Sequence, residues 1–216
     1  MSQPRAQLLA RGPWTPGAIA ADWLEDHYAP APDVLAAADA EIERLRERGS
    51  PSHDGLAARL VDWEVADGGL SMNLQPSRWA LRLLSGSEHG SISVLCTVRS
   101  AEGLWLAGKR AEWLASWPGR WALGAGGAVE VGEHPVVAMT RELEEEWSVA
   151  PQSLSIEALV QVPSGMALLV GSAVLPAGAE VTMDPEHDAF EWWPADVAEW
   201  PDHADHPLRT MASFLS

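Results

Sequence analysis

Four of the five residues between positions 142 and 146 are glutamates, and no lysine or arginine follows at helical spacing to neutralise them. On a helix, Glu145 and Glu146 fall within about 60° of Glu142, whereas Leu143 and Trp147 fall on another face that can enter a core. Unpaired carboxylates on one face repel each other unless a cation lies there, and Mg²⁺ and Mn²⁺ prefer oxygen ligands. The run therefore indicates a divalent metal site, with a solvated acidic face as the alternative.

The residues around this run extend the pattern. Gly127 is followed after five residues by Glu133, and after seven more by Arg141-Glu142-Leu143, with Glu145 and Glu146 completing the spacing. This segment resembles the signature of the Nudix hydrolases, in which the same glycine and glutamate precede Arg-Glu-apolar-x-Glu-Glu-x-Gly-apolar. A match at so many spaced positions is far more specific than a lone glycine motif.

Two positions depart from that signature. Ser148 stands where the family has its last glycine, so it must accept whatever backbone glycine allowed, at modest cost if φ is positive. Gly124 and Ala125 replace the proline that often precedes the glycine pair, so this loop is expected to be shaped differently. Neither departure removes a carboxylate, and we expect activity to survive both.

The resemblance implies an α/β (α+β) fold, a mixed β-sheet sandwiched between helices, with the signature forming a loop, a helix and a second loop. It implies an enzyme that hydrolyses the pyrophosphate bond of a small molecule, a nucleoside diphosphate linked to another moiety. It implies Mg²⁺ or Mn²⁺ as cofactor, since a bound metal neutralises the pyrophosphate, polarises phosphorus and lowers the pKa of an attacking water.

The resemblance also assigns roles to individual residues. Arg141 is expected to be mainly structural and to pair with Glu133, which pins the loop against the helix. The expected metal ligands are the helix glutamates Glu142, Glu145 and Glu146, completed by the backbone carbonyl of Gly126 or Gly127. The three glutamates are also expected to be catalytic.

Residues outside the signature are expected to complete the site. The family often uses a further carboxylate as base or ligand, and in the acidic loop Asp184–Pro194 we choose Glu186, with solvated loop charges as the alternative. His187 and His134 are expected to be structural or exposed, because hard metals rarely need imidazole. Trp121 is a candidate for substrate binding, although core packing explains it more simply.

Composition limits the partners. The 216 residues include 14 Lys+Arg and 31 Asp+Glu, a net charge of −17. Nucleic-acid affinity comes mostly from cationic contacts to phosphates, so this charge argues against a polynucleotide partner. No apolar run approaches the ~18 residues of a membrane span, and we expect a cytoplasmic protein. The single cysteine, Cys96, lies in an apolar segment and is expected to be buried.

The chain is expected to divide near residue 85. Residues 1–85 are predicted to be an extension of unknown role, mainly helical with one β-hairpin. Its predicted helices cover Pro16–His27, Asp33–Arg48 and Gly55–Val65. The alternation of Leu70, Met72 and Leu74 then predicts a strand, a turn at Pro76-Ser77 and a second strand.

Residues 86–216 are predicted to form the Nudix domain. The order of its elements indicates helices packed on a mixed sheet. Strands are predicted over 91–99, 103–110, 120–123, 154–162, 166–175 and 190–193, and helices over 135–147 and 208–215.

Other readings of the same sequence remain open. A catalytically silent Nudix-fold binding or regulatory module would be expected to lack one of the glutamates. A prenyl-diphosphate isomerase would need a cysteine as acid–base near the site, and Cys96 is the only candidate. The extension could be a lid, a buttress or a dimerisation arm. The apolar stripe of Asp33–Arg48 is too large to leave in water, and either docking within the chain or a dimer would cover it. We favour a homodimer, because the family that the sequence resembles often builds its substrate pockets at subunit contacts, and an extension of about 85 residues suits that use.

Overall fold

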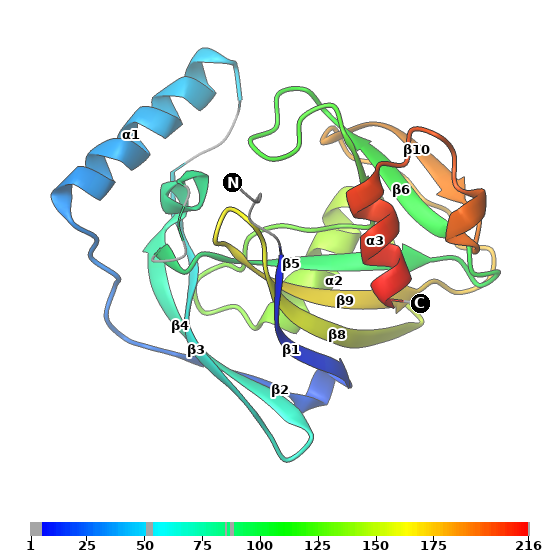
Figure 1. Cartoon of the computed structure of the whole chain (residues 1–216), viewed down its shortest axis with the longest axis horizontal. Coiled ribbons are helices and arrows are strands. Elements are labelled where there is room, and N and C mark those ends of the chain that lie inside the picture. Colours follow the sequence, from blue (N-terminus) through cyan, green and yellow to red (C-terminus); the bar gives the residue numbers. More distant parts are fainter. Residues whose placement is uncertain (1–5, 51–53, 85, 87–88, 216) are drawn as a thin grey trace.

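The structure is a computed structural model that describes residues 6–50, 54–84, 86 and 89–215 (Figure 1). Its helices are α1 (Pro32–Glu47), α2 (Pro135–Trp147) and α3 (His206–Leu215), with short 3-10 turns η1 (Pro16–Ala18), η2 (Trp79–Leu83) and η4 (Val197–Glu199). Its strands are β1 (Gln7–Trp14), β2 (Ile19–Trp23), β3 (Leu56–Ala66), β4 (Gly69–Arg78), β5 (Ile92–Arg99), β6 (Trp105–Arg110), β7 (Trp121–Leu123), β8 (Ser153–Gln161), β9 (Ala167–Val174) and β10 (His187–Trp193).

A seven-stranded sheet forms the centre of the described fold, in the order β1-β8-β9-β5-β6-β10 with β7 paired to β6. β5 and β9 are parallel, from Ile92 opposite Ala167 to Arg99 opposite Val174. The other neighbours pair antiparallel. The predicted mixed sheet is therefore confirmed.

α2 and α3 cover opposite faces of this sheet (Figure 1). Successive side chains of a strand point to opposite faces, so each strand can serve both cores. On β6, Leu106 belongs to the core that contains Leu143 and Trp147 of α2. Its neighbour Trp105 packs instead with Leu208 of α3. The sheet thus lies between helices, as predicted.

The elements predicted after residue 90 are all present. α2 has the predicted bounds, Pro135–Trp147. β10 differs most, because it begins at His187 rather than Phe190 and pairs there with the end of β6. This earlier start places the acidic loop before β10 beside the last residue of β6.

The N-terminal part is mainly β-structure, so the prediction of a mainly helical extension was wrong. Among the described residues of the extension, α1 is the one predicted helix that forms. Pro16–His27 contains η1 and β2, and Gly55–Val65 lies in β3. These strands form a three-stranded sheet, β2-β4-β3, whose pairing overrides the local helical pattern.

The β3–β4 hairpin turns at Asp67-Gly68, where both residues have positive φ, as a two-residue hairpin turn requires. β4 continues through Pro76 and Ser77, so the turn predicted there was wrong. The Pro76 carbonyl faces the β2 side, where it accepts a hydrogen bond from the Tyr28 N–H at 2.8 Å. Proline is tolerated because β2 stops pairing at Leu74 and no strand needs its missing N–H.

The extension contacts the rest of the chain at several places, among them the sheet edge and the glycine-rich loop. β1 pairs along β8 at the edge of the central sheet. Near the glycine-rich loop, the Ala58 N–H donates to the Val129 carbonyl at 2.9 Å, and the Leu60 N–H donates to the Gly90 carbonyl at 2.8 Å. Residues of the extension therefore flank the loop that precedes α2.

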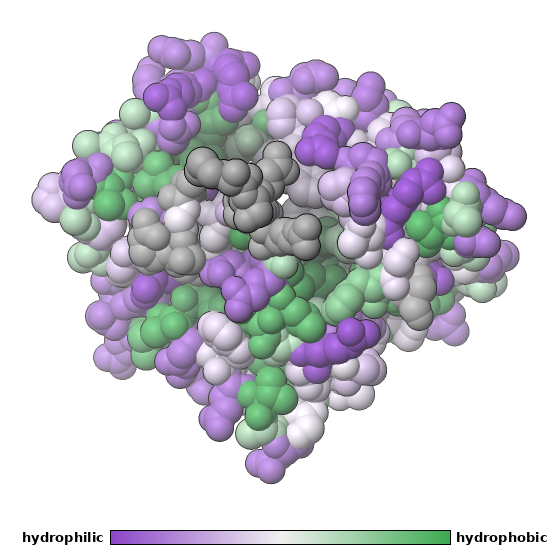
Figure 2. Space-filling model, in the orientation of Figure 1, coloured by the Kyte–Doolittle hydropathy of each residue, from purple (hydrophilic) through white to green (hydrophobic). Residues whose placement is uncertain are grey.

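Within the extension, α1 packs against η2, which covers most of the apolar stripe of the helix. Ala38 and Ile42 are buried with Ala80 and Leu81 of η2. In Figure 2, hydrophilic residues gather around the upper end of this helix, and more apolar residues lie toward its other end. None of the helices in the described part of the chain has the length and apolar character needed to cross a membrane.

Candidate active site

The loop and helix of the signature have well-defined ends. At the start of α2, His134 accepts a hydrogen bond from the Val136 N–H, and Pro135 occupies the first turn, where a missing N–H costs nothing. At the end, Ser148 is left-handed, with φ 54° and ψ 40°. The positive φ considered from the sequence is therefore present, at a cost of about 1 kcal/mol or less relative to glycine.

The three signature glutamates of α2 differ strongly in exposure. Glu145 is exposed, with 58% of its side chain accessible, whereas the Glu142 side chain is 12% exposed. Glu146 is buried, beside the core residues Leu143 and Trp147. The acidic face is therefore not uniformly solvated, because it runs from the exposed Glu145 to the buried Glu146.

Glu146 has one satisfied and one unsatisfied oxygen. Its Oε1 accepts a hydrogen bond from the Gly126 N–H at 3.0 Å, whereas its buried Oε2 makes no hydrogen bond to any described residue. Burial raises the pKa of Glu146 well above its ordinary value, and the charge of Glu142 adds to the shift. A buried carboxylate oxygen without a partner is costly. A cation at this position would remove that cost.

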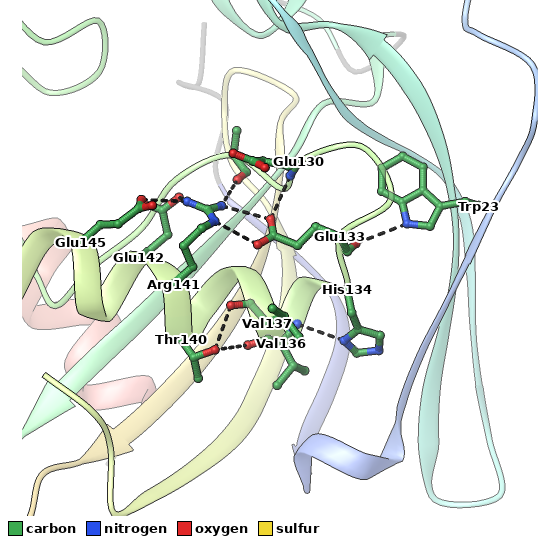
Figure 3. Close-up of polar contacts among 11 residues, drawn as sticks. Trp23, Glu130, Glu133, His134, Val136, Val137, Thr140, Arg141, Glu142 and Glu145 are labelled. Atoms are coloured by element: carbon green, nitrogen blue, oxygen red, sulfur yellow. Dashed lines mark hydrogen bonds and ion pairs between the residues drawn. The ribbon is translucent and has the colours of Figure 1, made fainter.

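Arg141 connects the loop to the helix (Figure 3). Its Nε and Nη2 donate to the two oxygens of Glu133 at 2.9 and 3.0 Å, which confirms the predicted pair. Nη2 also donates to the Ala128 carbonyl at 3.0 Å. Burial alone would raise the pKa of Glu133, but hydrogen bonds from Arg141 and from the Glu130 N–H outweigh it and lower the pKa.

Arg141 does more than the structural pairing that the sequence predicted. Its Nη1 lies 2.7 Å from Oε1 of Glu142 and 2.9 Å from Oε2 of Glu145. Burial raises the pKa of Glu142, and the Arg141 charge partly opposes that rise. Arg141 thus holds one oxygen of each of two predicted metal ligands.

The glycine pair leaves room for these carboxylates. A Cβ at Gly127 would overlap the Glu142 carboxylate, and a Cβ at Gly126 would lie 2.6 Å from the Val94 carbonyl. Neither position can therefore carry a side chain without movement. The Gly127 carbonyl already accepts a hydrogen bond from the Val94 N–H at 2.9 Å, which leaves one lone pair for another partner.

The donor chemistry fits a hard divalent cation. The nearby groups are carboxylate and carbonyl oxygens, and Oε2 of Glu146 is buried without a hydrogen bond from any described residue. In the described part of the chain no three metal-binding side chains are already gathered as a ligand set. Arg141 instead donates a hydrogen bond to one oxygen of Glu142 and to one oxygen of Glu145.

Glu186 lies beside a cation that the sequence reasoning missed. Nη2 of Arg110, the last residue of β6, is 3.7 Å from Oε2 of Glu186. Burial raises the pKa of Glu186, while Arg110 opposes the rise and Glu145 adds to it. The basic pair Lys109-Arg110 at a strand end just before the signature is the signal that could have identified Arg110.

His187 is buried behind the acidic helix, and its predicted structural character fits its contacts. Its ring lies 4.3 Å from that of Trp147, and Nδ1 lies 3.1 Å from Oδ1 of Asp184. Nε2 lies 3.7 Å from Oε2 of Glu146. Burial lowers the pKa of His187, which favours the neutral ring.

Trp121 and Cys96 occupy packed positions. The Trp121 ring stacks on His203 at 4.8 Å and lies 5.5 Å from Trp193, within the core beneath α3. Its role in substrate binding stays a prediction. Cys96 is fully buried in β5, and burial raises the pKa of its thiol to about 12. A thiol so placed is a poor acid–base, which argues against the isomerase alternative.

Comparison with known proteins places this arrangement in a family. A sequence model described as the NUDIX domain matches residues 89–213, more than half of the chain. No curated protein sequence matches the chain. The sheet between helices and the acidic loop–helix define a pyrophosphohydrolase. The chain belongs to the NUDIX family.

Solved structures with a similar fold include other members of that family. A MutT NUDIX hydrolase from Burkholderia pseudomallei is 23% identical, with 58% of this chain and 98% of that chain covered and a TM-score of 0.47. The NUDIX domain of Shewanella oneidensis NrtR, complexed with ADP ribose, is 19% identical over 58% and 88%, with a TM-score of 0.46. An Ap4A hydrolase from C. elegans is 19% identical over 57% and 97%, with a TM-score of 0.41.

The burial of Glu146 predicts how stability without metal depends on pH. The fold disfavours the charged carboxylate, so the folded state holds its proton to higher pH than the unfolded state, whose pKa is near 4.5. Stability from this group is therefore greatest below pH 4.5 and falls as pH rises through the raised folded pKa. In EDTA, the melting temperature of Glu146→Gln should exceed that of the wild type by several degrees, with roughly 2–4 °C for each kcal/mol.

Differential scanning calorimetry between pH 4.5 and pH 8 measures this difference. The difference should grow as pH rises, and Glu144→Gln, which removes an exposed charge from the same helix, should show little of it. A difference that is constant across this range would contradict the burial of a charged Glu146.

Proposed function

We propose that this protein is a metal-dependent hydrolase of the pyrophosphate bond in a nucleoside diphosphate linked to another moiety, such as a nucleotide, a nucleotide sugar or ADP-ribose. The observation that carries the proposal is the intact acidic helix, in which Glu146 keeps a buried oxygen without a partner. The hydrogen bonds from Arg141 to Glu133 support it, because they hold the loop against that helix. A silent binding module has no need for the complete set.

The proposed ligands are Glu142, Glu145 and Glu146, with Mg²⁺ or Mn²⁺ as the metal. A bound divalent ion would neutralise the pyrophosphate, polarise phosphorus and lower the pKa of an attacking water. Arg141 takes one oxygen from Glu142 and one from Glu145. A carboxylate can accept several bonds, so each keeps capacity for another partner.

Glu186 is the proposed general base. Its raised pKa brings the carboxylate closer to the range in which proton transfer is efficient at neutral pH. Arg110, 3.7 Å away, holds Glu186 at the end of β6. The same arginine adds positive charge on the side of the site where a substrate phosphate would carry negative charge.

A substrate panel tests the proposed function. Nucleoside triphosphates, ADP-ribose, dinucleoside polyphosphates and NADH are incubated with the enzyme and Mg²⁺ or Mn²⁺, and the products are separated by anion-exchange chromatography. We expect cleavage of at least one compound between two phosphates, and loss of that activity in EDTA. Binding of a panel compound without cleavage of any of them would instead support the binding-module alternative.

We also propose a cytoplasmic homodimer. α1 no longer supports a dimer, since its apolar face is covered within the chain. Val61, Trp63 and Val65 of β3 are exposed by 38, 40 and 52%, and apolar atoms lie near the tip of this hairpin (Figure 2). Light scattering should give twice the chain mass of 23.2 kDa. A mass of one chain across the micromolar range would contradict the dimer.

A further inference from the structure

A small hollow lies between the extension and the loop that precedes α2. Its volume is about 10 Å³, the room of roughly one water molecule. A group the size of a phosphate oxygen fits such a space, whereas a nucleobase does not. The lining comes from the extension, through Ala57, Ala58, Ser77, Arg78, Trp79 and Arg82, and from the catalytic part, through Ser91, Ile92 and Ala128.

Arg82 is the exceptional cation of this hollow. The guanidinium carbon lies 5.4 Å from the centre of the Trp79 ring, and Nη2 donates to the Ser93 hydroxyl at 2.9 Å. Arg78, in the same lining, is neutralised by ion pairs with Asp39 and Asp54. For Arg82, the described residues provide no carboxylate within ion-pair distance. Among the residues that the structure describes, Arg82 therefore has no direct counterion.

A short chain of contacts links Arg82 to the acidic helix. Ser93, whose hydroxyl accepts the hydrogen bond from the guanidinium, pairs with Ala128 through an isolated antiparallel β-bridge of the backbone. The next residue of the loop toward the N-terminus is Gly127, against which the Glu142 carboxylate lies. Arg82 is therefore linked through Ser93 and Ala128 to Gly127, the residue that lies against the Glu142 carboxylate.

The electrostatics agree with this placement. Burial lowers the pKa of Arg82 to about 10, so the guanidinium stays protonated at neutral pH. The charges of Glu142 and Glu186 raise this pKa, and the charge of Arg110 lowers it. Arg82 therefore interacts electrostatically with charged groups of the proposed active site.

Ser77 supplies another polar group to the lining of the hollow. Its Oγ is buried in the lining of the hollow and makes no hydrogen bond to any described residue. A buried hydroxyl is usually hydrogen-bonded, so this atom is available to a bound oxygen. A hydroxyl and a guanidinium together form donors suited to an oxyanion.

We propose that Arg82 binds a phosphate oxygen of the substrate, with Ser77 as a second donor, so that the extension completes the substrate site. This inference rests on the proposed function, and it deepens it by assigning phosphate recognition to residues outside the family's domain. An arginine suits this role because its planar guanidinium presents several donors to a phosphate and stays charged. In a chain of net charge −17, a cation that no described carboxylate pairs with directly can orient an anionic substrate.

Variants of Arg82 test the proposal. Arg82→Gln removes the charge but keeps a hydrogen-bond donor, and we expect KM to rise about 10- to 100-fold while kcat changes less than about threefold. Arg82→Lys restores the charge and should recover part of the loss. Arg46→Ala, which removes an exposed arginine from α1, is the matched control and should leave KM unchanged.

Binding of inorganic pyrophosphate with Mg²⁺, measured by isothermal titration calorimetry, gives a readout that does not need turnover. The Kd should weaken about 10-fold or more in Arg82→Gln and stay constant in Arg46→Ala. If the wild type hydrolyses no compound of the panel, the proposed function fails, yet this titration still decides the role of Arg82.

A melting curve establishes that each variant is folded. If Arg82→Gln does not fold, Ser93→Ala replaces it, because it frees the guanidinium from its hydroxyl partner and should raise KM about threefold or more. A folded variant with unchanged KM and unchanged Kd for pyrophosphate would overturn the inference while leaving the proposed function intact. A similar rise in KM for Arg46→Ala would also overturn it, since the effect would then be one of net charge.

Discussion

Replacing Glu146 with glutamine is expected to lower kcat by about 100- to 1,000-fold at saturating Mg²⁺, a loss typical for removal of one preorganised electrostatic contact. Glutamine keeps the shape and can still accept from the Gly126 N–H, which bonds Oε1 in the native protein. It removes the negative charge that would hold the cation. Glu145→Gln is expected to act in the same direction, because Glu145 lies on the same helix face nearer the solvent.

Steady-state kinetics across a range of Mg²⁺ concentrations measure both variants. The matched control is Glu144→Gln, since Glu144 directly precedes both residues on the same helix, is exposed, and by helical spacing falls on a different face from Glu142 and Glu146. Its kcat should remain within about twofold of the wild type. An unchanged kcat for both Glu145→Gln and Glu146→Gln would remove the metal-site hypothesis.

Arg141→Ala is expected to destabilise the protein by about 2–4 kcal/mol and to weaken metal binding. Loss of one partner from a fully buried ion pair costs about 3–5 kcal/mol, and the Arg141 side chain is 24% exposed, so the expected loss is somewhat smaller. The substitution leaves Glu133 without its cation and releases Glu142 and Glu145 from Nη1. Urea unfolding and Mn²⁺ titration measure the two effects.

A double-mutant cycle shows whether the effect passes through Glu133. The free energy of unfolding is compared for Arg141→Ala, Glu133→Gln and the double variant. The loss in the double variant should be smaller than the sum of the two single losses, because both single variants break the same bidentate pair. Arg46→Ala, in an exposed pair on α1, should cost about 0.5 kcal/mol or less. Strictly additive losses would mean that Arg141 and Glu133 do not act together.

Much of the candidate site could be predicted from the sequence because it is local. The carboxylates, Arg141 and Glu133 lie within one loop and helix, so fixed spacing is enough to bring them together. The helix bounds Pro135–Trp147 follow from the proline at its start and the apolar positions that it buries. Even the left-handed Ser148 could be anticipated, since glycine normally occupies that position.

The parts that were missed depend on contacts between distant segments. Gly55–Val65 has helical periodicity, yet β3 forms because β4 lies beside it across the Asp67-Gly68 turn. Arg110 and Glu186 come together because β10 pairs with β6, a register that no local pattern encodes. Arg82 could not be identified from the sequence for the same reason, since its hydrogen bond to Ser93 depends on how the extension packs on β5.

The pairing of β1 with β8 means that the folding unit of this enzyme is larger than the family domain within it. The family match begins at residue 89, yet the edge of the central sheet is closed by residues 7–14. A chain shortened to the family boundary would leave the backbone N–H and C=O groups of β8 open to strands from other molecules. The extension is also bonded to the start of α2, because the Trp23 Nε1–H donates to the Glu133 carbonyl and the His134 ring nitrogen Nε2 bonds the Ile19 carbonyl. Removing the extension would therefore change both the sheet edge and the contacts of the loop that precedes α2.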